Sequence, residues 1–178
     1  MESAAAPAIG AIVAEQGGRD VLIAFARELE ACGVRVRGLV QRSEPEMHLV
    51  DIHGGRAYAI TQNLGSGSLS CRIDPTGFAE ASAVLRDALA EGADLVVVNR
   101  FGKLEADGGG LAAEMLTVMA EGVPLLTCVG AEQMAPWRAF TGGAAQLLPA
   151  DLAALRRWWM AAAPLGKRPP SDVGEPMR

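Results

Sequence analysis

Chemistry-bearing side chains follow the most apolar stretch of the chain, residues 94–99, in the segment Asn99-Arg100-Phe101-Gly102-Lys103-Leu104-Glu105. In enzymes that bind a nucleotide together with Mg²⁺, a central strand ends in an acidic residue that helps to hold the phosphate-bound Mg²⁺. Here that position is Asn99, whose amide supplies no negative charge. Arg100 and Lys103 could hold an anion instead, with Glu105 as an orienting partner or base. The alternative is that Lys103 and Glu105 are solvated loop charges and that Asn99 caps a turn.

A second candidate segment is rich in glycine and serine. Glycine lets backbone N–H groups converge on an anion, serine adds hydroxyl donors, and an arginine can grip a tetrahedral oxyanion with two hydrogen bonds. The alternative is a plain hairpin loop, with its cysteine a buried, inert thiol because no histidine lies near it. The ligand-binding candidates here are Gln62, Asn63, Gly65, Ser66, Gly67, Ser68, Cys71 and Arg72.

The turn between residues 9–14 and 21–32, read as a strand and an amphipathic helix, is where a phosphate-binding loop would sit. It reads Glu15-Gln16-Gly17-Gly18-Arg19-Asp20 and lacks the GxxxxGK(S/T) pattern. No lysine is available for the phosphates and no hydroxyl for Mg²⁺. Glu15 and Asp20 flank the anion position, so the loop is predicted to be a degenerate phosphate grip, with the anion bound elsewhere.

Strand and helix patterns alternate along the chain, which predicts an α/β fold with three layers: a mostly parallel sheet flanked by helices, with one inserted antiparallel hairpin. We expect a single domain over 1–163 and a disordered tail over 164–178. Strands are expected at 9–14, 34–41, 47–52, 57–61, 94–99, 124–129 and 146–148, and helices at 21–32, 75–91, 110–121, 132–140 and 151–162.

Sheets of this kind bind ligands at the carboxyl ends of their strands, at a topological switch point. This rule selects candidate residues from the strand ends alone. They are Glu15 to Arg19, Gln41 and Arg42, Asn99 to Lys103, and Val129 to Gln133.

Composition narrows the function classes. The chain has 178 residues and a formal net charge of −5, which gives no support for nucleic acid as a partner. No apolar run is long enough to span a membrane, and the N-terminus lacks a basic region typical of secretion signals, so a cytoplasmic protein is expected. The three cysteines lack CxxC spacing and the two histidines, His48 and His53, are five residues apart. We therefore expect no metal site.

The order of the segments resembles the P-loop nucleoside triphosphatases that hydrolyse nucleotides with broad base preference. Residues 33–39 are similar to that family's "GVKVGGF" strand, and 51–56 to its hairpin. Residues 99–106 align with a "DEIGKMEL" segment, in which Gly102, Lys103 and Glu105 are kept and the acidic pair is replaced by Asn99-Arg100.

A closer resemblance is to a bacterial domain family encoded near molybdate-transport and molybdenum-enzyme genes. Its "GLVQR" and "NxFGKxEA" motifs match residues 38–42 and 99–106, its "QDxGxGxxxCRLD" motif is similar to 62–74, and "AWRAFxGG" is similar to 136–143. Residues 43–47 lack the cysteine expected there. The family has no established activity, so the resemblance implies a fold more than a function.

Together these features predict a non-hydrolytic cytoplasmic accessory protein that binds molybdate, tungstate or a phosphorylated ligand and requires no cofactor. Arg42, Lys103 and the glycine-serine segment with Arg72 would supply the donors, and no catalytic residue is assigned. One alternative is a divergent nucleoside triphosphatase. The other is a protein-binding adaptor, in which tryptophans and short apolar helices form a homo-oligomer or a surface for a molybdenum-metabolism partner.

Overall fold

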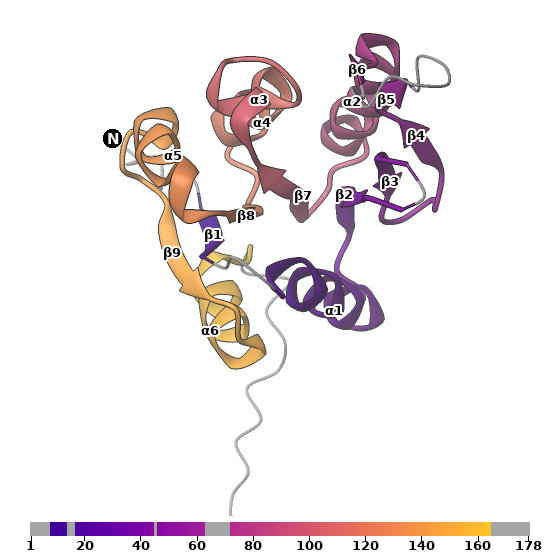
Figure 1. Cartoon of the computed structure of the whole chain (residues 1–178). Helices are drawn as coiled ribbons and strands as arrows, with labels where there is room; N and C mark the ends of the chain where they lie inside the picture. The colour runs from indigo at the N-terminus through magenta and orange to yellow at the C-terminus, as the bar shows by residue number, and fades with distance from the viewer. Residues whose placement is uncertain (1–7, 14–16, 45, 63–71, 165–178) are drawn as a thin grey trace, which may run out of the picture.

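The computed structural model describes residues 8–13, 17–44, 46–62 and 72–164 (Figure 1). The strands are β1 (Ile9–Val13), β2 (Val36–Arg42), β3 (His48–Asp51), β4 (Ala57–Ala59), β5 (Thr61–Gln62), β6 (Arg72–Ile73), β7 (Leu95–Phe101), β8 (Leu125–Val129) and β9 (Gln146–Pro149). The helices are α1 (Gly18–Ala31), α2 (Pro75–Ala90), α3 (Lys103–Ala106), α4 (Ala112–Ala120), the 3₁₀ turn η1 (Ala131–Gln133), α5 (Met134–Thr141) and α6 (Leu152–Ala162).

The main sheet has seven strands in the order β4-β3-β2-β7-β8-β1-β9. The run from β2 to β9 is parallel, and β3 and β4 add an antiparallel hairpin beside β2. A separate two-stranded ribbon pairs β5 with β6. The predicted α/β class, with its mostly parallel sheet and inserted hairpin, is confirmed.

Strand β7 lies at the centre of the sheet and is buried on both faces. Leu95, Val96, Val97 and Val98 are each 0% exposed. Val96 and Val98 belong to the core on one face, whereas Leu95 and Val97 belong to the core on the other. A continuous run of branched apolar residues is what a strand covered by helices on both sides requires.

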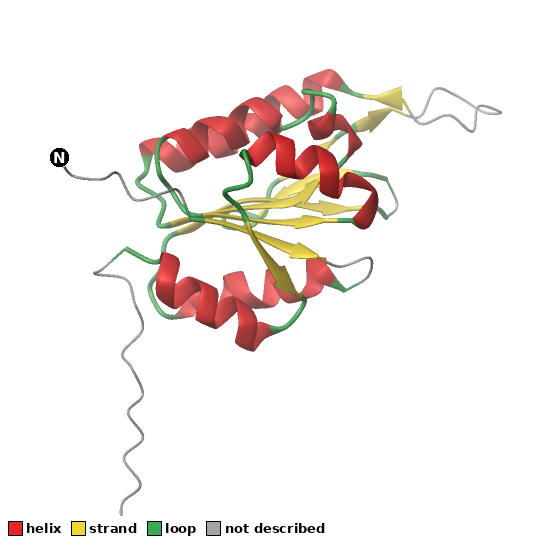
Figure 2. Cartoon of the chain, turned by 90° about the vertical axis from the view of Figure 1, so that its left-hand side faces the viewer, coloured by secondary structure: helices red, strands yellow, loops and turns green. Residues whose placement is uncertain are grey.

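Helices cover both faces of the sheet, as Figure 2 shows. On one face α1 and α6 contribute Phe25, Leu155 and Trp159 to the core. On the other face α2, α4 and α5 contribute Leu85, Met115 and Trp137. Since Trp137, Trp158 and Trp159 are all buried in these cores, the tryptophan surface expected in the adaptor hypothesis does not exist.

The topology creates a switch point beside β1. Helix α1, which follows β1, packs on one face, whereas α4 and α5, which follow β7 and β8, pack on the other. Strands β1 and β8 are neighbours, so the chain leaves their carboxyl ends in opposite directions. A crevice outside those ends is the expected consequence.

The predicted helix at 75–91 and the predicted hairpin both begin from local sequence features. The carboxylate of Asp74 accepts a hydrogen bond from the Thr76 N–H at 2.9 Å, and Pro75 begins α2. Pairing of β3 with β4 confirms the predicted hairpin around Gly54 and Gly55. His53 lies in the turn of this hairpin, where its ring Nδ1 is 3.4 Å from the Glu30 carboxylate.

Two segments differ from the elements predicted for them. The expected strand at 57–61 is interrupted at Ile60, whose backbone bonds Met47 and Asp74 rather than one partner strand. The segment before the expected helix at 110–121 contains the short helix α3, which ends before a glycine turn at 108–110. The predicted tail at 164–178 lies, apart from Pro164, outside the described residues.

The sheet has two different edges. Strand β4 is only three residues long and packs beside α2. At the other edge β9 ends at Pro149, which has no backbone N–H to donate. Within the described residues no helix is both long and apolar enough to cross a membrane.

Gly38 lets β2 lie close to β7. Its φ of 143° is open to glycine, and a Cβ there would collide with the Val97 carbonyl. We expect Gly38→Ala to lower the free energy of unfolding by at least about 2 kcal/mol in urea denaturation. In Gly109→Ala the new methyl meets its nearest neighbour at 3.5 Å, so that variant should stay within about 1 kcal/mol of wild type. Equal effects of the two substitutions would contradict this assignment.

Candidate functional site

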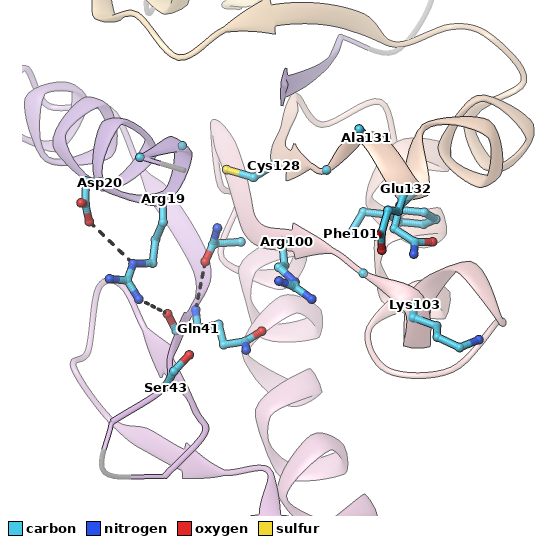
Figure 3. A pocket seen from close by; sticks show the side chains of 16 residues that line it. Arg19, Asp20, Gln41, Ser43, Arg100, Phe101, Lys103, Cys128, Ala131 and Glu132 are labelled. Carbon is cyan, nitrogen blue, oxygen red and sulfur yellow. Dashed lines mark hydrogen bonds and ion pairs between the residues drawn. The ribbon is translucent and has the colours of Figure 1, made fainter. Parts of the chain in front are cut away.

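A cleft of about 710 Å³ opens at the carboxyl ends of the central strands (Figure 3). The start of α1, the ends of β2, β7 and β8, and η1 all contribute to it, which places it at the switch point. Its charged side chains are Arg19, Asp20, Arg100, Lys103 and Glu132. The remaining lining residues are Gly17, Gly18, Gln41, Ser43, Asn99, Phe101, Gly102, Cys128, Gly130, Ala131 and Gln133.

The start of α1 lies in the wall of the cleft. Gly17 precedes the helix with a φ of 80° and has no side chain to cap it, so the first amide groups of the helix keep no intrahelical acceptor. Because α1 begins at Gly18, a GxxxxGK(S/T) loop would end at residues 18–20. Arg19 therefore stands at the lysine position and Asp20 at the hydroxyl position.

Arg19 is held across the mouth of the cleft. Its Nη1 donates to the Gln41 carbonyl at 3.2 Å, and its Nε lies 3.6 Å from the Asp20 carboxylate. Both contacts are drawn in Figure 3. The guanidinium is thus tied to the end of β2 and to its own neighbour, so its charge is partly compensated.

Asn99 and Arg100 form the floor of the cleft at the end of β7. Asn99 is 6% exposed, and its Oδ1 accepts a long hydrogen bond, 3.4 Å, from the Gln41 N–H. Asn99 therefore links β7 to β2. Arg100 lies between Arg19 and Lys103 in Figure 3, is exposed, and has no hydrogen-bond or ion-pair partner among the described residues.

Cys128 reaches the cleft from the end of β8. Burial raises the pKa of its thiol to about 11, and a hydrogen bond with the Asn99 amide opposes this only in part. The thiol is therefore neutral near pH 7 and is a poor nucleophile. In the cleft it contributes a small, weakly polar part of the lining.

Lys103 extends from the first turn of α3 toward solvent. Its Nζ lies 2.9 Å from the Asp107 carboxylate, one helical turn away, and this ion pair raises the pKa of the lysine. Its side chain is 80% exposed. Lys103 can reach an anion at the rim only by leaving Asp107.

Glu105 is a buried carboxylate with backbone partners. Its Oε2 accepts from the Gly102 N–H at 3.0 Å and its Oε1 from the Leu111 N–H at 3.2 Å. Both oxygens thus fix the turn that carries Gly102 and Lys103. This arrangement gives Glu105 a positioning role and leaves it outside the lining of the cleft.

The structure brings together only some of the predicted ligand-binding residues. Asn99 and Lys103 line the cleft, and Arg42 lines an adjoining hollow of about 690 Å³. Gln62 and Arg72 lie on the paired strands β5 and β6, and Figure 2 shows this ribbon near the end of the sheet to which the parallel strands point. Asn63, Gly65, Ser66, Gly67, Ser68 and Cys71 fall outside the described residues.

Other lining residues did not enter the sequence-based site. Arg19 and Gln133 belong to the strand-end segments selected by the switch-point rule, so that rule alone finds them. Cys128 and Ser43 carry no motif, and only the pairing of the strands places them here. In the described part of the chain, no group of three or more His, Cys, Asp or Glu residues could hold a metal ion.

The fold is the P-loop nucleoside triphosphatase-like arrangement that the sequence predicts. The fold matches the crystal structure of THEP1 from the hyperthermophile Aquifex aeolicus with a TM-score of 0.60 at 15% identity, over 79% of this chain and 88% of that one. It matches the solution structure of a human cancer-related nucleoside triphosphatase with a TM-score of 0.58 at 16% identity, over 79% and 87% of the two chains.

Residues 9–158 match the family described as "Protein of unknown function (DUF2478)", and the chain belongs to that family. A relative in Bradyrhizobium diazoefficiens (strain USDA 110), "Molybdenum import ATP-binding protein ModC 2", is 38% identical over 148 residues. The match covers 79% of this chain and 16% of that protein, so the chain spans about one sixth of its relative's length.

The two backbone bonds of Glu105 predict a structural effect of its replacement. Glu105→Gln turns one acceptor oxygen into an NH₂ group facing an N–H donor, so we expect a loss of about 1–3 kcal/mol of unfolding free energy. Glu114→Gln, at a carboxylate paired with exposed Arg86, should cost less than about 1 kcal/mol. Urea denaturation of both variants measures the difference, and an undisturbed Glu105→Gln would refute the positioning role.

Cys128 predicts a pH dependence of stability. The pKa of the thiol is about 11 in the folded protein and 9.0 when unfolded. The neutral thiol therefore contributes fully to the free energy of unfolding below pH 9, and this contribution is lost as the pH rises from 9 to 11. Over this pH window we expect the free energy of unfolding of wild type to fall by on the order of 2 kcal/mol relative to that of Cys128→Ala. Denaturation curves at several pH values measure the gap; a constant gap would contradict the burial argument.

Proposed function

We propose that this chain is a cytoplasmic binding protein that holds an oxyanion-bearing ligand in the switch-point cleft and does not hydrolyse it. The observation that carries the proposal is Arg100, an exposed guanidinium near the end of the central strand with no hydrogen-bond or ion-pair partner among the described residues. It lines the same cleft as Gly17 and Gly18 at the start of α1. Arginine and free backbone N–H groups are the donors that suit a tetrahedral oxyanion. Lys103 lies at the rim, where an arriving anion competes with Asp107.

This placement differs from the one drawn from the sequence, which located the anion at the glycine-serine segment and excluded the loop before α1. Two observations favour the cleft. Gly17 and Gly18 line it directly, and Asp20 is turned toward Arg19 rather than standing alone. The repulsion expected from Asp20 is therefore partly cancelled by its ion pair.

The relative's name supports the choice of ligand. Similarity to part of a molybdenum import ATP-binding protein favours molybdate, its close analogue tungstate, or a phosphorylated molecule of molybdenum metabolism. A binding module inside or beside such a system would need to recognise the oxyanion without consuming it. The chain matches only a small part of the relative, so we propose that it works together with a separate protein of the same system.

The charges of the site argue against hydrolysis. A P-loop enzyme holds Mg²⁺ with a Ser/Thr hydroxyl at the start of the helix and an acidic residue after a central strand. Asp20 and Asn99 stand in their place, and Glu105, the base suggested by the sequence, has both oxygens engaged by backbone N–H groups. A divergent nucleoside triphosphatase stays the second candidate because the fold is shared with such enzymes.

The proposal is tested by thermal-shift and calorimetric titrations with molybdate, tungstate, sulfate, phosphate, ATP and GTP, each with and without Mg²⁺. Saturation at about a hundred times Kd should stabilise the folded chain by about 2.7 kcal/mol. Arg100→Gln should weaken oxyanion binding by about tenfold or more, because a charge-assisted hydrogen bond is lost.

Arg157→Gln is the matched control, since it removes one exposed positive charge on α6, outside the cleft. It should bind like wild type. If both variants weakened binding equally, the effect would come from net charge and not from the position of Arg100. If no anion raised the melting temperature, the proposal would be refuted. Phosphate release from ATP or GTP that requires Mg²⁺ and disappears in Lys103→Ala would establish the hydrolase instead.

A further inference from the structure

The cleft continues into a second hollow of about 690 Å³ along the side of α1. Arg19, Asp20 and Ser43 line both, so the two spaces are joined and Arg19 lies at their junction. The second hollow is otherwise formed by one face of α1 and by the end of β2. The binding surface is therefore elongated rather than a single pocket.

The chemistry of the second hollow is also cationic. Arg27 on α1 and Arg42 at the end of β2 border it, both exposed and without an ion-pair partner among the described residues. Between them Ile23 and Ala24 provide an apolar floor. Arg27, Ile23 and Arg19 are spaced by four residues and so lie on one face of the helix.

The joined surface carries more positive than negative charge. Among the described residues, five cationic side chains border the two spaces, against the three acidic side chains of Asp20, Glu44 and Glu132. The surface thus has an excess of positive charge, although the whole chain has a formal net charge of −5. Such a local reversal of sign concentrates anions at the surface.

Size distinguishes among anionic ligands. Pockets of about 300–1,000 Å³ accommodate organic ligands of drug size, and each of the two spaces falls in that range. A bare tetrahedral oxyanion is a few atoms across and would contact only the Arg100 end. The apolar floor and the two further arginines would then serve no ligand group.

We propose that the ligand is an organic molecule with two separate anionic groups. One group, a phosphate or a similar oxyanion, lies at Arg100 and the start of α1, the organic body crosses Arg19, and the second anionic group lies between Arg27 and Arg42. This inference rests on the proposed oxyanion site and extends it. Arg19 is the residue that both halves of the ligand contact, in exchange for its bond to Gln41.

Calorimetric titration with adenosine 3′,5′-bisphosphate, AMP, phosphate and molybdate tests the inference. The bisphosphate carries two anionic groups on one organic body, and we expect it to bind at least tenfold more tightly than AMP or either inorganic anion. The double variant Arg27→Gln/Arg42→Gln should remove that advantage while leaving molybdate or phosphate binding within about twofold of wild type. Arg157→Gln should change neither.

The outcomes separate this inference from the proposed function. Inorganic anions that bind through Arg100, with no advantage for the bisphosphate, would overturn the two-anion ligand and leave the oxyanion site standing. A bisphosphate advantage that survives the Arg27→Gln/Arg42→Gln substitutions would also overturn it. Binding of none of the four probes would refute both proposals.

Discussion

The burial of Leu95 to Val98 on both faces of β7 is the constraint on which the rest of the structure depends. Leu95 to Val98 alternate between two cores, so helices must lie on both faces and β2 and β8 must flank the strand. Once that arrangement is set, the first polar residue of the strand, Asn99, emerges at the carboxyl edge beside the ends of its neighbours. The position of the cleft therefore follows from the packing of the core. The side chains that line it are not fixed by that packing.

The lining is organised by polar contacts between segments that are distant in sequence. Arg19 bonds the Gln41 carbonyl, the Gln41 N–H bonds Asn99, and Asn99 meets the Cys128 thiol. This chain of contacts ties the start of α1 to the ends of β2, β7 and β8. The contact with Asn99 lowers the pKa of the Cys128 thiol, but burial raises it by more, so the thiol stays neutral. Arg100 stands outside the chain of contacts, which leaves it available to a ligand.

Much of the fold was predictable from the sequence, and the site only in part. Alternating strand and helix patterns, the apolar run at 94–99 and the Asp74-Pro75 helix start all follow local rules and are found as expected. The switch-point rule selected the strand-end segments that line the cleft. The sequence could not show that Glu105 bonds two backbone N–H groups, because its partner Leu111 is positioned by α4. It also could not place Cys128, whose neighbours come from the pairing of β7 with β8.

The proline that ends β9 has a consequence for assembly. A parallel sheet with an open border can add strands from another molecule through backbone hydrogen bonds. Here Pro149 offers no donor at one border, and at the other β4 is too short to guide a second chain. Short edge strands of this kind are poor templates for pairing, so contacts with another chain would fall on side chains of the helices and loops. Recognition of that kind can be changed one residue at a time while the sheet that supports the cleft stays intact.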